Sequence, residues 1–318
     1  MSTDRPVVVA VPEEAYAAGL ADAAHVEPVV WDPSHRHERE AEFRLVVPPY
    51  MGPPPRVERF RDLPALEVVQ LLSAGYETVL DRIPPGVTLC NGAGIHDAST
   101  AELALTLTLA SERDLATHLL AQSRSSWAGP RMWRALADKR VLVVGYGRIG
   151  HAIVSRLLPF EVEVTVVATR ARGGDDLVDA VHGIDELPVL ARTADVLILI
   201  VPLTDSTRGL IDADVLARLP DDALVVNVAR GPIVDTDALV AECSSGRLRA
   251  ALDVTDPEPL PADHPLWSTR GVIITPHIGG ATSAMAPRAR ALVRRQVEAL
   301  RDGRPLENVV KPATSLSR

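Results

Sequence analysis

The chain has 318 residues, of which 47% are hydrophobic, and it carries a formal net charge of −9. This length and composition predict a folded protein of one or two domains and exclude a disordered chain. The negative charge argues against non-specific nucleic-acid binding, which needs clustered positive charge on the protein.

The two cysteines, Cys90 and Cys243, have neither the number of a disulfide framework nor the spacing of a metal site. His35 and His37 lie among charged residues, where a metal site and a solvated loop are the alternatives. No nearby Cys or further His completes a ligand set, which favours the loop.

The N-terminus lacks a signal-peptide pattern, and the apolar runs are too short for a membrane span. We therefore expect a cytoplasmic protein without a metal ion.

Short β-rich runs alternate with helical patterns along the chain, which is typical of parallel sheets with helices on both faces. A first series of runs predicts a smaller, flavodoxin-like sheet. Its members are Val7–Val11, Val29–Trp31, Leu45–Val47, Val68–Leu72 and Thr88–Cys90. A second series of six runs predicts a full dinucleotide-binding sheet. Its members are Val141–Val144, Val164–Val167, Val196–Val201, Leu224–Val228, Ala250–Val254 and Val272–Thr275.

Two long helical patterns accompany these runs. The first extends from Ser99 to Gln122 between the two series, and Ser99 and Glu102 have the spacing of a capping box at its start. The second extends from Ser283 to Leu300, and Pro287 is expected in its first turn, where a missing amide costs little.

The second helical pattern suggests a discontinuous small domain, because the helix would return the chain to the first sheet. Residues 1–97 and 284–318 would then form the substrate (catalytic) domain, and residues 98–283 the dinucleotide-binding domain. The predicted fold class is α/β, with a Rossmann doubly wound parallel sheet and a second, smaller, discontinuous flavodoxin-like domain.

A glycine-rich motif follows the run Val141–Val144 and precedes a helical stretch. Its residues, all expected to contact a cofactor, are Gly145, Tyr146, Gly147, Arg148, Ile149 and Gly150. The first glycine permits a tight turn, the second lets the backbone approach a pyrophosphate, and the third lets helix and strand pack closely. The helix N-terminus would bind the phosphates. The strand before the motif and the helix after it favour this interpretation over a glycine-rich turn without a ligand.

The end of the next strand indicates which dinucleotide is used. An NAD site usually has Asp or Glu about 20 residues past the glycine motif, bonded to the ribose hydroxyls. Here the strand ends in Ala168-Thr169-Arg170-Ala171-Arg172, without a carboxylate. Arg170 or Arg172 would pair with a ribose phosphate, and Thr169 is also expected at this site. We therefore expect NADP to be favoured over NAD, unless both are ordinary loop arginines.

Arg230 is the candidate for substrate binding. It lies in Asn227-Val228-Ala229-Arg230-Gly231, at the end of an apolar run, and ligands gather at the carboxyl ends of parallel strands. A guanidinium there can bind a substrate carboxylate and polarise the adjoining ketone, whose oxygen gains charge as hydride arrives. The alternative is a salt bridge to Asp235 or Asp237.

His277 is the candidate acid/base, because it follows another buried-type strand and histidine titrates near neutral pH. Ketone reduction needs a proton donor beside the carbonyl. A carboxylate next to the ring would favour the imidazolium and fix its orientation, and Glu258 is the candidate. Taken singly, His277 is more often a satisfied loop histidine and Glu258 an exposed carboxylate. The joint presence of both with Arg230 favours the functional interpretation.

The motifs, and their order along the chain, resemble those of the D-isomer-specific 2-hydroxyacid dehydrogenases. The resemblance covers nearly the whole chain. It includes the glycine motif, the run Asn227 to Asp235, Asp253-Val254 through Glu258-Pro259, and Thr275-Pro276-His277. It implies that Arg230 binds the substrate, that His277 is the acid/base and that Glu258 is its partner.

The resemblance also implies contacts outside this catalytic set. Asp253 and the backbone at Ala229 would lie near the nicotinamide carboxamide, and Pro202 is a further expected cofactor contact. Ser73-Ala74-Gly75 resembles the small-domain loop whose amides hold the substrate carboxylate. Tyr50 and Met51 fall where such enzymes form part of the substrate pocket.

Departures from the family pattern narrow the function. The segment Ala168-Thr169-Arg170 replaces the usual Asp, as in NADPH-using glyoxylate and hydroxypyruvate reductases. Formate dehydrogenases carry Gln in place of Glu258, and phosphite dehydrogenases use a small-domain lysine, which residues 1–138 lack. The leading hypothesis is an NAD(P)H-dependent reductase of a small 2-oxo acid, with glyoxylate- or hydroxypyruvate-like substrates favoured.

A homodimer is expected, since family members are commonly dimeric. The alternative is a dinucleotide-sensing binding protein on the same fold, which the intact triad disfavours.

Overall fold

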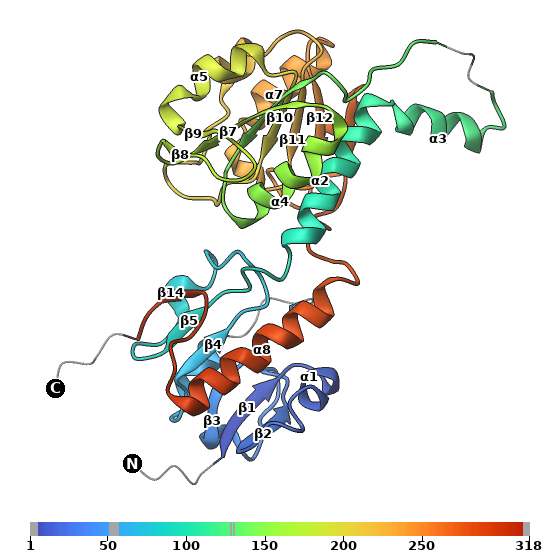
Figure 1. The fold of residues 1–318 in the computed structure, drawn as a ribbon. Coiled ribbons are helices and arrows are strands. Elements are labelled where there is room, and N and C mark those ends of the chain that lie inside the picture. The colour runs from blue at the N-terminus through green and yellow to red at the C-terminus, as the bar shows by residue number, and fades with distance from the viewer. Residues whose placement is uncertain (1–5, 51–56, 128, 130, 314–318) are drawn as a thin grey trace. The chain divides into compact units, whose positions relative to one another are not determined.

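The chain divides into two compact units (Figure 1). The computed structural model describes residues 6–50, 57–127, 129 and 131–313. One unit comprises Met1–His96 and Thr282–Arg318, and the other comprises Asp97–Ala281. Each is built on one mostly parallel sheet, which confirms the predicted α/β class. Among the described residues, no helix combines the length and the apolar character that crossing a bilayer requires.

The discontinuous unit contains a six-stranded sheet in the order β14-β5-β4-β3-β1-β2. All neighbours are parallel except β14, which is antiparallel to β5 and was not predicted. Without β14 the strand order is that of a flavodoxin-like sheet. The strands are β1 (Val7–Val11), β2 (Val26–Val30), β3 (Phe43–Val46), β4 (Val68–Gln70), β5 (Thr88–Cys90) and β14 (Val309–Lys311).

Helical segments cover both faces of this sheet. One face packs against α1 (Glu14–Ala18) and α8 (Met285–Asp302), and Figure 1 shows α8 lying along it. The other face packs mainly against the 3₁₀ helices Val57–Asp62 and Leu80–Arg82. A third 3₁₀ helix spans Glu40–Glu42. The last long helix therefore belongs to the same unit as β1.

The second unit contains an eight-stranded sheet in the order β13-β12-β11-β10-β6-β7-β9-β8. From β9 to β12 the parallel strands follow the doubly wound dinucleotide-binding order, and β13 extends it. The strands are β6 (Arg140–Val144), β7 (Glu163–Ala168), β8 (Arg172–Gly173), β9 (Ala180–Gly183), β10 (Val196–Leu199), β11 (Leu224–Asn227), β12 (Arg249–Leu252) and β13 (Val272–Ile274). The antiparallel hairpin of β8 and β9 was not predicted, because its segment is mostly exposed and lacks an apolar run.

Two apolar layers cover this second sheet. Helices α2 (Asp97–Glu112) and α4 (Arg148–Leu157) pack on one face. Helices α5 (Leu187–Leu190), α6 (Ala213–Arg218) and α7 (Thr236–Ser244) pack on the other. Short 3₁₀ helices span Leu158–Phe160, Ile184–Glu186, Ala191–Thr193, Gly231–Ile233 and Pro265–Trp267.

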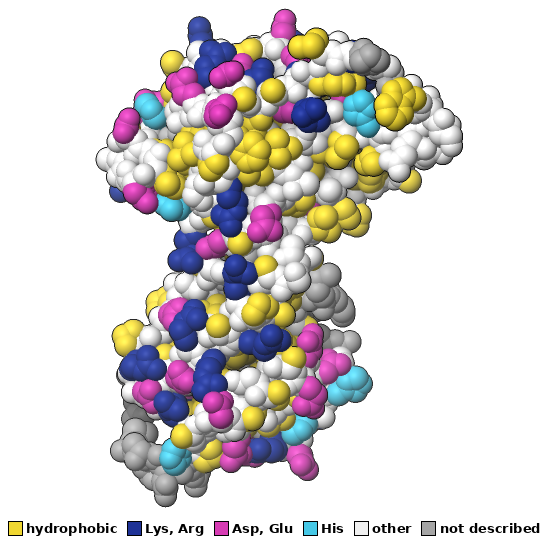
Figure 2. Space-filling view, turned by 45° about the vertical axis from the view of Figure 1, so that its right-hand side comes forward, with side chains coloured by type: hydrophobic (Ala, Val, Ile, Leu, Met, Phe, Trp, Pro, Cys, Tyr) yellow, Lys and Arg dark blue, Asp and Glu magenta, His cyan; other side chains and the backbone are white. Residues whose placement is uncertain are grey.

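The predicted single helix from Ser99 to Gln122 is wrong. Helix α2 ends at Glu112, and α3 (Leu115–Ser123) begins after Asp114, whose φ of 47° places it in the left-handed region and breaks the helix. The predicted capping box is also wrong, because Ser99 lies buried within the first turn of α2. Helix α3 is largely exposed, and Figure 2 shows hydrophobic side chains on the surface of this unit.

Candidate active site

Three neighbouring strands of the second unit carry the predicted catalytic residues just beyond their carboxyl ends. The strands β11, β12 and β13 are parallel neighbours. Arg230 follows β11, Glu258 lies in the segment after β12, and His277 follows β13. Parallel strands end at the same edge of a sheet, so all three residues belong to one edge.

His277 and Glu258 contact each other directly. The Nδ1 atom of His277 lies 2.6 Å from Oε1 of Glu258. The two side chains are 44% and 41% exposed, so solvent reaches the pair. A carboxylate at Nδ1 fixes the orientation of the ring and leaves Nε2 as the nitrogen available to a substrate. The predicted contact is present, and its catalytic role stays a prediction.

Asp253 organises the loop that carries His277. It is buried, and its Oδ1 accepts hydrogen bonds from Thr275 Oγ1 at 2.6 Å and from the Ile278 amide at 2.9 Å. Its Oδ2 accepts from the Gly279 amide at 2.9 Å, and its carbonyl oxygen accepts from the His277 amide at 2.8 Å. These bonds hold His277 at a φ of 54°, a conformation uncommon for residues other than glycine. This positioning role was not foreseen, and the predicted contact of Asp253 with the carboxamide stays a prediction.

Replacing Glu258 by glutamine should lower kcat for 2-oxo acid reduction by about tenfold, while the Kd for NADPH is unchanged. The reason is that an amide forms a weaker hydrogen bond than a carboxylate and orients the His277 ring less firmly. The measurement is kcat together with NADPH binding for both proteins. Glu186→Gln is the matched control, because Glu186 accepts from His182 at 2.8 Å outside this site. An unchanged kcat in Glu258→Gln would show that Glu258 does not act through His277.

Arg230 lies in a segment held by the buried side chain of Asn227. The Asn227 amide donates to the Arg230 carbonyl at 3.0 Å, and its oxygen accepts from the Ala229 amide at 3.0 Å. The guanidinium donates to the Ala229 carbonyl at 2.6 Å. Within the described part of the chain Arg230 pairs with no carboxylate, and Asp235 instead caps α7. The alternative salt bridge to Asp235 or Asp237 is therefore not formed, and most of the guanidinium donors remain available to an anion.

The glycine motif forms the turn between β6 and α4. Gly145 has a φ of 111°, and a β-carbon there would lie 2.4 Å from the Ile200 carbonyl oxygen. A β-carbon on Gly150 would lie 2.0 Å from the Gly145 carbonyl oxygen, so both positions require glycine. Apart from the adjoining backbone, no described residue has an atom within 4 Å of the corresponding position on Gly147, at the start of α4. An open backbone at a helix N-terminus fits a pyrophosphate.

The other residues of the motif have partners inside the protein. Tyr146 is buried, and its hydroxyl donates to the Asp175 carboxylate at 2.9 Å. Burial, together with this carboxylate, raises the pKa of Tyr146. Arg148 donates to Asp97 at 2.9 Å, and Ile149 packs against the apolar layer beside α4. These side chains hold the turn, so the backbone is the part available to a cofactor.

The segment after β7 places both predicted arginines in exposed positions. Thr169 and Arg170 are exposed, whereas the Arg172 guanidinium donates to the Tyr146 carbonyl at 2.8 Å. Pro202 is exposed beyond β10, and Ala229 is buried beyond β11. No contact in the structure tests their predicted roles toward a cofactor.

Sequence reasoning missed Asp175 and Asp176, which lie on the turn of the β8–β9 hairpin. Asp175 also accepts from the Leu177 amide at 3.0 Å, and this bond, with that from Tyr146, lowers the pKa of Asp175. With His151, the two carboxylates offer ligand atoms within 4.8 Å of one another. The only local signal was the pair of glycines before Asp175, because the contact with Tyr146 spans 29 residues.

The predicted substrate residues lie in the other unit. Ser73, Ala74 and Gly75 follow β4, and Tyr50 stacks on His96 with ring centroids 4.9 Å apart. Met51 lies outside the described residues. A cavity of about 110 Å³ is lined by Pro48, Pro49, Tyr50, Leu71, Leu72, Ser73, Gly75, Thr78 and Val79.

The two cysteines are not candidate nucleophiles. Both are buried, and burial raises the pKa of Cys90 to about 11 and that of Cys243 to about 12. The thiolate is the nucleophilic form of cysteine, so both side chains remain thiols at neutral pH.

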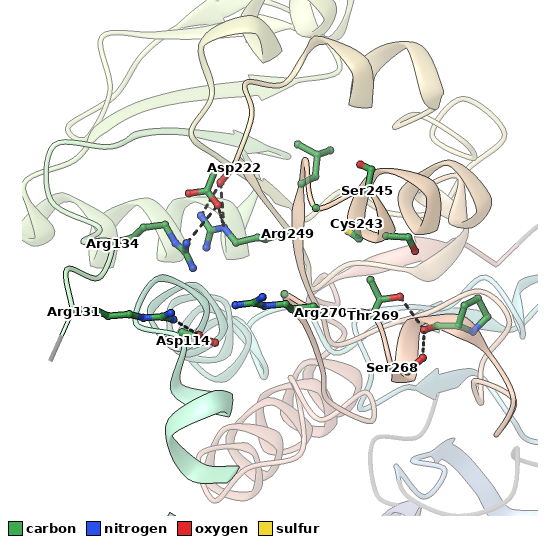
Figure 3. Close-up of a pocket in the computed structure, with 15 residues that line it drawn as sticks. Asp114, Arg131, Arg134, Asp222, Cys243, Ser245, Arg249, Ser268, Thr269 and Arg270 are labelled. Carbon is green, nitrogen blue, oxygen red and sulfur yellow. Dashed lines mark hydrogen bonds and ion pairs between the residues drawn. The ribbon is translucent and has the colours of Figure 1, made fainter. Parts of the chain in front are cut away.

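A larger cavity of about 620 Å³ lies at the opposite edge of the second unit's sheet (Figure 3). Its lining includes Arg249, which begins β12, and Gly271, which precedes β13. Two ion pairs cross it, Arg131 to Asp114 at 3.1 Å and Arg134 to Asp222 at 3.5 Å. None of the predicted site residues lines this cavity, so it belongs to a different part of the unit.

Comparisons with known proteins show which family the chain resembles. The family described as "D-isomer specific 2-hydroxyacid dehydrogenase, NAD binding domain" matches residues 105–279. The chain is 31% identical to a human protein named glyoxylate reductase/hydroxypyruvate reductase, over 77% of each chain. A D-isomer specific 2-hydroxyacid dehydrogenase from Xanthobacter autotrophicus Py2, solved with NADPH and MES, superimposes with a TM-score of 0.82 at 29% identity, covering 97% of this chain and 98% of that one. An NADPH-dependent glyoxylate/hydroxypyruvate reductase from Sinorhizobium meliloti, solved with NADP and malonate, gives 0.77 at 26% identity, covering 96% and 97%.

Proposed function

Because this chain belongs to the D-isomer specific 2-hydroxyacid dehydrogenase family, whose enzymes depend on NAD(P), we propose that it reduces a glyoxylate- or hydroxypyruvate-like 2-oxo acid with NADPH. The observation that carries the proposal is the pairing of His277 with Glu258 at the sheet edge that also presents Arg230 without a carboxylate partner. The names of the human and Sinorhizobium relatives support the substrate class.

The residues divide the reaction between them. When bound, the reduced nicotinamide supplies the hydride that reaches C2 of the substrate. Arg230 binds the substrate and stabilises the negative charge that develops on the ketone oxygen. His277, oriented by its contact with Glu258, donates the proton that completes the hydroxyl group. In the reverse direction the neutral imidazole accepts that proton.

A substrate panel tests this proposal. The purified protein is mixed with NADPH or NADH and with glyoxylate, hydroxypyruvate, pyruvate or longer 2-oxo acids, and loss of the reduced cofactor is followed. We expect the highest kcat/KM with glyoxylate or hydroxypyruvate. Failure of every 2-oxo acid to react, with folded protein that binds the cofactor, would refute the proposed function.

The preference for NADPH rests on the segment after β7. This segment presents Arg170 and Arg172, and its strand end carries no carboxylate. Asp175 lies near the glycine motif, but Tyr146 and two backbone amides already donate to its carboxylate. The Xanthobacter structure contains NADPH, which supports the same choice here.

Replacing Arg170 by alanine should raise the KM for NADPH by about tenfold or more and change the KM for NADH less. The lost interaction is a charge-assisted hydrogen bond to the 2′-phosphate, which NADH lacks. Arg170 is chosen rather than Arg172, because Arg172 also donates to the Tyr146 carbonyl and its replacement would disturb the glycine motif. The control is Arg192→Ala, at an exposed position of the same unit. Equal changes in KM for both cofactors would contradict the assignment.

We also propose that the protein forms a homodimer through the second unit. Large apolar side chains on α3 and on the described segment after it are exposed, and Figure 2 shows such side chains on the surface of this unit. They are Leu115 (45%), Leu119 (55%), Leu120 (58%), Trp127 (94%) and Met132 (96%). Exposed apolar patches of this kind mark interaction sites. A mass in solution equal to one chain would contradict the proposal.

A further inference from the structure

The loop after β4 has all its carbonyl groups engaged in hydrogen bonds. We call Leu71–Gly75 the substrate loop. Five different donors serve its five carbonyl oxygens. Leu71 accepts from Gln70 Nε2 (2.7 Å), Leu72 from His96 Nε2 (2.8 Å), Ser73 from the Gly92 amide (2.6 Å), Ala74 from Asn91 Nδ2 (2.7 Å) and Gly75 from Ser73 Oγ (2.7 Å). The three central bonds come from the segment after β5.

These bonds fix the direction of the amides. In a trans peptide the N–H of one residue points opposite to the carbonyl of the residue before it. The carbonyls of Leu72, Ser73 and Ala74 are therefore held toward the β5 side, and the amides of Ser73, Ala74 and Gly75 point away from it. No described residue accepts a hydrogen bond from these three amides. Successive amides that face the same way form an anion-binding nest.

The other side of the substrate loop is lined differently. Strand β4 lies between β3 and β5 in the sheet, so the loop has one flank toward each neighbour. The cavity of about 110 Å³ lies against the loop and includes Pro48, Pro49 and Tyr50 from the segment after β3.

The donors on the β5 side are fixed in turn. His96 is 5% exposed, and the Tyr50 ring stacks on it. Because a carbonyl oxygen only accepts, Nε2 of His96 carries the hydrogen toward Leu72. A β-carbon on Gly92 would lie 2.4 Å from the Leu72 carbonyl oxygen, so the two segments touch at the backbone. Asn91 is 9% exposed, and shielding from water strengthens these bonds.

We infer that Asn91 and His96 are positioning residues for the substrate carboxylate, because they hold two carbonyls of the substrate loop so that three successive amides face the acid. The inference rests on the proposed function, in which a small 2-oxo acid is bound, and on the resemblance of Ser73-Ala74-Gly75 to the small-domain loop whose amides hold the substrate carboxylate. It extends that assignment to two side chains that act through the loop and do not touch the substrate.

The kinetic test uses variants that remove one donor each. Asn91→Ala and His96→Phe should raise the KM for glyoxylate about tenfold, while kcat changes less than threefold and the Kd for NADPH is unchanged. His96→Phe keeps a ring for Tyr50, and His96→Gln, which restores a donor, should recover part of the loss. Asn308→Gly is the matched control. It removes an amide that donates to the Ala93 carbonyl at 2.8 Å, and glycine tolerates the φ of 54° there. It should leave KM unchanged.

Amide chemical shifts provide a readout that does not depend on turnover. The full-length protein is saturated with NADP⁺ and titrated with oxalate, a planar dicarboxylate that cannot accept hydride. We expect the amide resonances of Ser73, Ala74 and Gly75 to move in the wild-type protein, and oxalate to bind at least fivefold more weakly to Asn91→Ala.

The outcomes separate the inference from the proposed function. If the three amides do not respond to oxalate, or if they respond with equal affinity in the wild-type protein and in Asn91→Ala, the inference is wrong. If they respond as expected but no 2-oxo acid is reduced, the positioning role stands and the proposed function fails. If Asn91→Ala lowered kcat and weakened NADPH binding as much as it raised KM, Asn91 would have a merely structural role and the inference would be wrong. Should His96→Phe not fold, Asn91→Ala decides alone.

Discussion

Replacing His277 by asparagine is expected to lower kcat for 2-oxo acid reduction by about 10²–10⁴-fold, the usual contribution of general acid–base catalysis. Asparagine tolerates the left-handed backbone at this position, where φ is 54°, so the loop keeps its conformation. It cannot supply the proton that the developing alkoxide needs. Cofactor binding should be unchanged, because the ring of His277 bonds only to Glu258 among the described residues. Single-turnover kinetics with NADPH and glyoxylate measures the chemical step.

The control for this variant is His182→Asn. His182 also pairs with a carboxylate, Glu186 at 2.8 Å, but it lies on β9 rather than at the carboxyl ends of β11 to β13. It should keep kcat within about twofold, the size of ordinary surface effects. A loss of less than tenfold in His277→Asn, or an equal loss in both variants, would mean that the acid is another group.

Replacing Arg230 by alanine is expected to reduce kcat/KM on the order of 10³-fold, because one group supplies both substrate binding and charge stabilisation at the ketone oxygen. The guanidinium has no carboxylate partner among the described residues, so its removal leaves no unpaired acid behind. The loss should therefore appear in catalysis and not in folding. The measurement is kcat/KM for glyoxylate together with the thermal unfolding midpoint.

Two further variants sharpen this prediction. Arg230→Lys keeps the charge but lacks the planar fork, so it should recover only part of the activity. Arg218→Ala, at an exposed position in the last turn of α6, should change neither quantity. Added guanidinium ion should partly restore activity to Arg230→Ala and not to Arg230→Lys. An Arg230→Ala protein with near-normal kcat/KM would remove Arg230 from the proposed mechanism.

The parts of the fold that sequence predicted are those that local patterns specify. Buried parallel strands form apolar runs, and the glycine motif marks the turn after β6. The candidate catalytic residues could be predicted because each follows such a run within a few positions. The hairpin of β8 and β9 was missed, because an exposed antiparallel pair has no apolar run. The break at Asp114 was missed, since one left-handed residue leaves the helical pattern on either side intact.

The interactions that sequence could not predict are those between residues far apart in the chain. The bond from Tyr146 to Asp175 spans 29 residues, and those from Thr275, Ile278 and Gly279 to Asp253 span 22 to 26. An aspartate after a buried strand is equally consistent with a ligand contact and with a loop anchor. Only the folded chain shows that both carboxylate oxygens of Asp253 are engaged within the protein.

The anchoring role of Asp253 helps to distinguish active from inactive proteins that share this fold. A protein that retained the arginine, the glutamate and the histidine but lost this aspartate would lose the three side-chain bonds that anchor the residues on either side of the histidine, and we expect it to be a poor catalyst. Scoring only the side chains that react would therefore count such a pseudoenzyme as competent. The buried carboxylate beneath the histidine is the better marker of a working site.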